Sequence, residues 1–98
     1  MDYTSFNHTL DMGAPPEDFP VALKALWWER KNYWDTAHDM VQHFPGKDAA
    51  WVHAYLHRKE GDKDNAQHWY RKAEKPFPEI DLNEEFRNIV ADLLKEYS

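Results

Sequence analysis

The chain has 98 residues, a length that suits one domain with a hydrophobic core of its own. It contains no cysteine, which excludes disulfides, iron–sulfur clusters and thiolate zinc sites and favours a cytoplasmic location. The net charge is −6, from 12 basic and 18 acidic residues, so we expect neither nucleic acid nor an anionic membrane as the main partner.

The first eighteen residues are polar and acidic, and they end in Ala14-Pro15-Pro16-Glu17-Asp18. They lack the basic and apolar regions of a signal peptide, and no apolar run in the chain approaches the ~20 residues that span a bilayer. Tyr3, Phe6 and Leu10 are spaced for one or two helical turns. We expect residues 1–18 to form a loosely docked arm.

From Phe19 onward the apolar residues recur with a helical period, and no segment alternates as a strand would. The pattern predicts a single all-α domain over residues 1–98, with helices over 20–31, 34–44, 49–60, 63–75 and 83–97. Asp48, Asp62 and Asp81 are placed to cap three of these helices, and Gly61 lies where a helix end favours glycine.

The C-terminal segment, residues 81–98, has an unbroken apolar stripe at helical spacing, formed by Phe86, Ile89, Val90, Leu93, Leu94 and Tyr97. One stripe requires one partner surface. We therefore expect this helix to cap the last apolar face of the preceding helices.

An internal repeat appears at a spacing of 29 residues, at which Ala25 matches Ala54 and Ala37 matches Ala66. Small residues allow two helix axes to approach closely where they cross. The repeat predicts two antiparallel helical hairpins, over residues 19–46 and 47–78, followed by the capping helix.

The second hairpin carries Asp62-x-x-x-Ala66-x-x-Trp69-Tyr70-x-x-Ala73, which resembles the Sel-one-like branch of the tetratricopeptide repeat superfamily. The stretch AWVHAYLHRKEGD, residues 50–62, also resembles small bacterial proteins of unassigned function. The superfamily resemblance implies a right-handed α-α superhelix, with the first helix of each hairpin lining a concave surface that binds protein or peptide partners.

Trp51, Tyr55, Arg58 and Lys59 fall at positions that face the groove in this superfamily. Trp, Tyr and Arg dominate binding hot spots, and an Arg–Lys pair suits a carboxylate such as a peptide C-terminus. The alternative interpretation is that Trp51 and Tyr55 pack in the core.

Trp27 and Trp28 point about 100° apart on a helix, so both are buried only if two faces are covered. We expect the N-terminal arm to cover one of them. A homodimer contact or a second partner site at Trp28 is the alternative.

His53 and His57 share one helix face at a spacing of four residues, and His38 and His68 lie on neighbouring predicted helices. The simpler interpretation is structural: these histidines are hydrogen-bonded interior or groove residues. The alternative is a metal site of His38, His53 and His57, although position 54 is Ala and the glutamate of H-E-x-x-H is missing.

Catalytic motifs are otherwise absent from the sequence: it has no phosphate-binding glycine loop, no G-x-S-x-G and no cysteine nucleophile. We predict a non-enzymatic module without a cofactor, which binds a protein or peptide through Trp51, Tyr55, Arg58, Lys59 and Trp28. The alternative function is a metal- or small-ligand-binding protein centred on the histidines.

Overall fold

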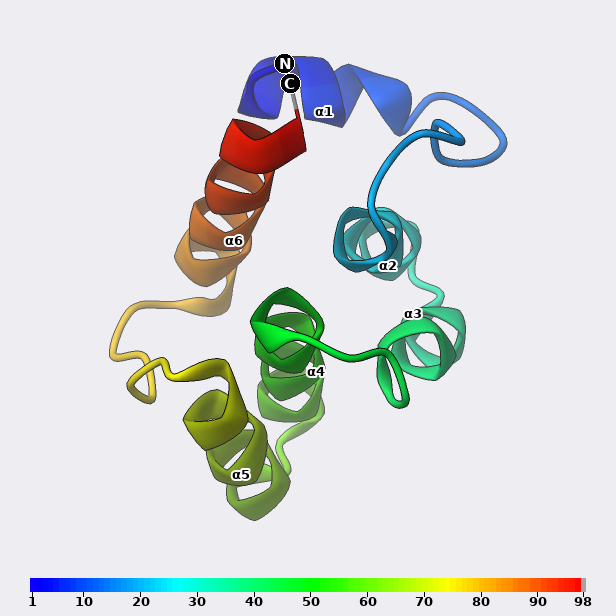
Figure 1. The fold of residues 1–98 in the computed structure, drawn as a ribbon. Coiled ribbons are helices and arrows are strands. Elements are labelled where there is room, and N and C mark those ends of the chain that lie inside the picture. Colours follow the sequence, from blue (N-terminus) through cyan, green and yellow to red (C-terminus); the bar gives the residue numbers. More distant parts are fainter. Residues whose placement is uncertain (98) are drawn as a thin grey trace.

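The computed structural model describes residues 1–97, and this part of the chain is all-helical, without strands (Figure 1). The all-α prediction is confirmed, with one helix more than the five expected. None of the described helices is both long and apolar enough to cross a membrane. The helices are α1 (Tyr3–Thr9), α2 (Val21–Arg30), α3 (Trp34–Val41), α4 (Lys47–Glu60), α5 (Lys63–Ala73) and α6 (Leu82–Tyr97).

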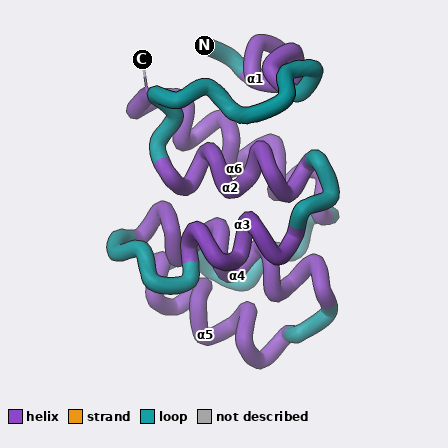
Figure 2. The backbone as a smooth tube through the Cα atoms, turned by 90° about the vertical axis from the view of Figure 1, so that its right-hand side faces the viewer, coloured by secondary structure: helices purple, strands orange, loops and turns teal. Residues whose placement is uncertain are grey.

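Helix α4 is the centre of the molecule, in contact with α2, α3, α5 and α6 (Figure 1). Consecutive helices pack as two pairs, α2 with α3 and α4 with α5, and Figure 2 shows the pairs following one another through the molecule. The four alanines that the repeat assigns to the helix crossings, Ala25, Ala37, Ala54 and Ala66, are all completely buried. Because the side chains there are small, the helix axes approach closely.

Helix α6 lies across the first helices of both pairs, α2 and α4, and also contacts α1. Its stripe enters the main core: Phe86, Ile89 and Val90 are completely buried, and the Phe86 ring lies against Phe6 and Tyr55. The prediction of a cap on the last apolar face therefore needs correction. The stripe covers a face that both pairs form together, so one helix completes the core of the whole chain.

The N-terminal arm is a helix fixed by the core, and the prediction of loose docking is wrong. Asp2 caps α1 by accepting a hydrogen bond from the Ser5 N–H at 2.9 Å. Phe6 is completely buried and stacks on Phe19. The indole of Trp27 donates to Thr9, so the arm covers Trp27, as expected for one of the two tryptophans.

Two turns set the position of α4. Gly46 precedes the helix at φ +105°, and Asp48 lies inside the first turn, so the prediction of Asp48 as N-cap is wrong. The helix ends at Gly61, whose φ of +92° is favourable only for residues without a Cβ atom. Asp62 then caps α5 by accepting from the Asn65 N–H, as predicted, which brings α5 back along α4.

Candidate metal centre

Two histidines project from the face of α4 that lies between α3 and α5. His53 and His57 are one helical turn apart, and only 3% and 6% of their surfaces are exposed. Their imidazole centroids are 4.8 Å apart. Buried polar rings of this kind need hydrogen-bond partners; His53 has one on α3, and His57 has one on α4 itself.

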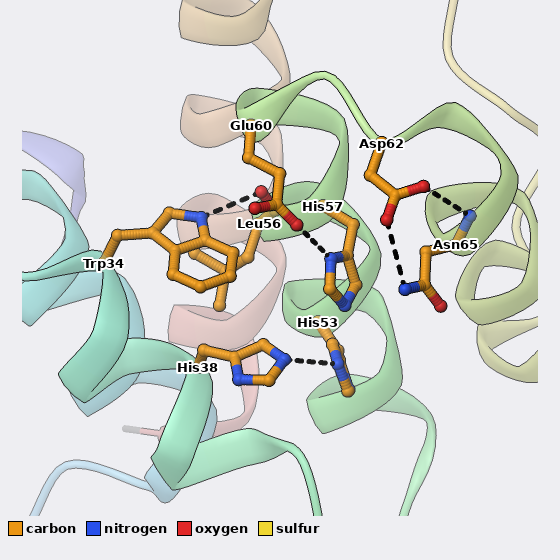
Figure 3. Close-up of polar contacts among 8 residues, drawn as sticks. All are labelled: Trp34, His38, His53, Leu56, His57, Glu60, Asp62 and Asn65. Atoms are coloured by element: carbon orange, nitrogen blue, oxygen red, sulfur yellow. Dashed lines mark hydrogen bonds and ion pairs between the residues drawn. The ribbon is translucent and has the colours of Figure 1, made fainter.

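His38 of α3 completes a three-histidine cluster (Figure 3). Its Nε2 lies 3.0 Å from Nε2 of His53, and its ring centroid lies 5.1 Å from that of His57. One nitrogen of each of the three residues can be chosen so that all three lie within 4.8 Å of one another. The tertiary contact of α3 with α4 therefore gathers the three residues of the alternative interpretation into one site.

Glu60 adds a carboxylate behind the cluster. Glu60 is the last residue of α4, and His57 lies one turn before it. The Glu60 Oε2 atom is 2.6 Å from Nδ1 of His57 (Figure 3). When the Nδ1–H donates to this carboxylate, the lone pair of a neutral His57 is on Nε2, away from Glu60. A carboxylate that orients an imidazole in this way is a common supporting contact of metal-binding histidines.

Two indole rings form the walls of the cluster. Trp34 stacks on His38 with a centroid distance of 4.9 Å, and Trp69 of α5 stacks on His53 at 3.9 Å. The Trp34 indole N–H donates to the carbonyl of Leu56 at 2.9 Å, which ties α3 to α4 beside the site. The rings hold two of the imidazoles in place and limit their rotation.

The environment favours the neutral form of the His53 and His38 imidazoles. Burial, together with the smaller effects of the neighbouring His38 and His57, lowers the pKa of His53 to about 3. Burial, followed by the charge of His57, also lowers the pKa of His38. Neutral imidazole is the form that binds a metal ion.

The donor set suits a transition metal. Imidazole nitrogen is a favoured ligand of zinc, copper and nickel, and zinc binds it at about 2.0–2.1 Å, which sets ligand nitrogens about 3.3 Å apart in a tetrahedron. The Nε2 atoms of His38 and His53 are already 3.0 Å apart. Nδ1 of His53 is buried and finds no hydrogen-bond partner among residues 1–97, so the Trp69 ring, and not a second hydrogen bond, orients this imidazole.

A second acidic group beside the cluster has a structural explanation. His57, Glu60 and Asp62 also lie close enough to hold an ion. Both Asp62 oxygens already accept hydrogen bonds, from the Asn65 backbone N–H and from its side-chain amide, each at 3.2 Å. Asp62 therefore acts as the α5 cap.

The predicted binding stripe on α4 is divided between internal contacts. Tyr55 is 1% exposed and packs on Phe86, so the prediction that it faces a partner is wrong. Arg58 does bind a carboxylate, but one from its own chain: Nη1 donates to Oε1 of Glu85 at 2.8 Å. Its other terminal nitrogen donates to the Ile80 carbonyl.

Lys59 and Arg58 do not form one carboxylate clamp. Lys59 pairs with Glu29 of α2, whereas Arg58 is directed to α6. Trp51 is half-buried, with Nζ of Lys75 4.2 Å from the centre of its ring. Trp28 is half-buried on α2, whereas the other four predicted residues lie on α4.

Sequence reasoning missed three residues of the site. Glu60 lies three positions after His57, on the same helix face, so its spacing was a usable signal. Trp34 lies four positions before His38 and is a similar case. Trp69 reaches His53 only through the packing of α5 on α4, which no spacing within one helix indicates.

Comparison with known proteins finds no matching family model, curated protein or solved structure.

Proposed function

We propose that this protein binds one divalent transition-metal ion, with zinc as the first candidate, through His38, His53 and His57. The observation that carries the proposal is the convergence of three imidazoles from two helices, with the Glu60 carboxylate on the rear nitrogen of His57. A core histidine without a ligand role needs partners for its donor and acceptor nitrogens but does not need two further imidazoles. The combination of donors and supporting carboxylate is typical of zinc and copper sites.

Metal loading tests this proposal directly. The protein is stripped with a chelator, titrated with zinc in a calorimeter, and measured by elemental analysis after gel filtration. We expect one zinc per chain, and its loss in His38→Ala, a substitution at the least buried of the three ligands. His8→Ala, at an exposed histidine on α1, is the matched control and should retain zinc. Substoichiometric zinc in the wild-type protein would contradict the proposal.

The finer fold assignment is also a proposal: the pairs α2/α3 and α4/α5 form two tetratricopeptide-like hairpins of a short right-handed superhelix. The 29-residue repeat and the buried alanines at the crossings support it. In such an array α2 and α4 would line the concave surface, and α6 packs on these two helices. The groove would then be filled by the chain itself.

A second candidate function is binding of a protein partner, including a second copy of the chain, through the end of α2. The half-buried Trp28 packs edge-on against Tyr33, which is 54% exposed. Aromatic pairs of this kind are enriched at binding hot spots. A pull-down with wild type and with Trp28→Ala, combined with light scattering, tests both occupants. Equal capture by the two proteins and a monomeric wild type would remove this candidate.

A further inference from the structure

The histidine cluster supplies three donors, whereas zinc and cobalt sites of this kind bind four ligands. Among residues 1–97, no fourth His, Asp or Glu side chain belongs to the same close group. Trp34 and Trp69 present ring faces, and an indole has no lone pair to donate. The Glu60 carboxylate is bound to Nδ1 of His57, whereas Nε2 of the same ring would bind the metal. Glu60 therefore acts on the metal only through that imidazole.

A cavity of about 480 Å³ lies next to the cluster, between the α3–α4 turn and α5. Three of its lining residues connect it to the histidines. Gln42 lies one helical turn after His38, Ala50 lies one turn before His53, and Trp69 stacks on the His53 ring. Of the five described pockets, this is the one that shares a residue with the walls of the cluster.

The lining of this cavity is cationic. Lys47 and Lys72 contribute ammonium groups to it, and no carboxylate lines it, although Lys47 is paired with Glu74 outside the lining at 3.0 Å. Lys72 extends over the Trp69 ring, with Nζ 5.1 Å from the ring centre, so its charge lies at the wall that this ring forms between the cavity and His53. A metal ion held by three neutral imidazoles keeps its full double positive charge. Both the cavity and the metal would therefore attract an anion.

We propose that the metal centre keeps one coordination position for a small anion, which enters from the cavity beside Trp69 and Lys72. The inference rests on the proposed metal-binding function and adds to it a reactive position instead of a closed structural site. The ligand class is a small anion with a donor lone pair, such as hydroxide or a carboxylate. A site with three protein ligands and an exchangeable fourth position is the arrangement found in catalytic zinc centres.

Cobalt and azide are the probes for this proposal. Cobalt(II) replaces zinc in tetrahedral sites, and its visible absorption changes when a ligand is exchanged. We expect azide to change the spectrum of the cobalt-loaded protein saturably. Lys72→Glu should weaken azide binding by roughly tenfold, because it reverses a charge at the entrance. Lys95→Glu makes the same charge change on α6, away from the cavity, and should leave azide binding unchanged.

The possible outcomes separate the two proposals. If cobalt does not bind, the proposed function fails, and the open position fails with it. If cobalt binds but azide leaves the spectrum unchanged, the site is closed and only the present inference fails. If Lys72→Glu and Lys47→Glu both bind azide as tightly as the wild-type protein does, the ligand does not enter from this cavity. The inference is then overturned in that part.

Discussion

Nε2 of His53 on α4 lies 3.0 Å from Nε2 of His38 on α3, which is a hydrogen-bond distance. Either nitrogen can carry the proton that the two share. In the metal-free protein, one imidazole must donate while the other accepts. A metal ion coordinated by both Nε2 atoms would replace that proton. Protons and metal ions should therefore compete for the same pair of atoms.

Acidification should destabilise the metal-free protein. The pKa of His53 is about 3 in the folded protein, chiefly through burial, whereas an unperturbed histidine has a pKa of about 6.5. Between these values the unfolded chain binds more protons, so the free energy of unfolding falls as pH falls below about 6.5. One such group contributes a slope of about 1.4 kcal/mol per pH unit. Urea unfolding at pH 7, 6 and 5, with a chelator present, measures this slope.

The variant His53→Gln separates His53 from the other titrating groups near it, which include His38, His57, His68 and His43. Glutamine does not titrate, so the slope below pH 6.5 should become smaller. His8→Gln on the exposed face of α1 should retain the wild-type slope. Parallel pH curves for wild type and His53→Gln would show that His53 is not the sensing group.

Glu60→Gln should reduce zinc affinity by about 10- to 100-fold without unfolding the protein. The amide keeps a hydrogen bond to Nδ1 of His57 but loses the charge that strengthens the imidazole as a ligand. The Glu60 side chain is 40% exposed, so the metal-free protein should keep its melting temperature. Competition titration against a chromophoric chelator gives the affinity. Glu79→Gln, at an exposed position after α5, is the control, and equal affinities for both variants would contradict the role of Glu60.

Arg58→Glu should destabilise the fold by about 3–5 kcal/mol. Arg58 is the cation of the buried Glu85, and the substitution places a second carboxylate against it. Tyr70 also donates to Glu85 at 2.6 Å and would remain, so the loss is specific to the charge. Thermal or urea unfolding measures the effect. Arg71→Glu, at an exposed position on α5, should change stability by less than about 0.5 kcal/mol. An unchanged melting temperature in Arg58→Glu would mean that Arg58 is available to a partner.

Phe6→Ala should cost about 3–5 kcal/mol, a value expected for a large buried aromatic ring. The ring is completely buried and lies 6.0 Å from Phe19 and 6.1 Å from Phe86, centroid to centroid. Met12→Ala, at an exposed position in the same N-terminal segment, should have little effect. If the two variants unfold at the same urea concentration, α1 is not part of the core.

The sequence predicts the helices of this chain better than their partners. The stripe of α6 is evident from Phe86 to Leu94, because a helix repeats its face every 3.6 residues. The same stripe does not say which surface it covers, and the expected cap is in fact a helix lying across α2 and α4. Arg58 and Lys59 show the same limit: their charge suited a carboxylate, but Glu85 and Glu29 lie 27 and 30 residues away.

In the candidate site, too, the contacts within one helix are predictable from the sequence, whereas the contacts between helices are not. The pairing of His53 with His57 follows from helix geometry alone, as does the position of Glu60 on their face. The approach of His38 depends on the packing of α3 against α4, which the predicted hairpin order made plausible but did not fix. The stacking of Trp69 on His53 depends on α5 and left no pattern in the sequence.

The contact between Trp69 and His53 also gives the molecule an internal optical signal. Their rings are stacked with centroids 3.9 Å apart, so the indole is within range of electron transfer to a protonated imidazole or to a bound paramagnetic ion. Part of the emission of the five tryptophans, that of Trp69, should therefore be quenched when the cluster takes up a proton or copper(II). The state of the centre can then be read by light emission from the unlabelled protein, at concentrations too low for calorimetry.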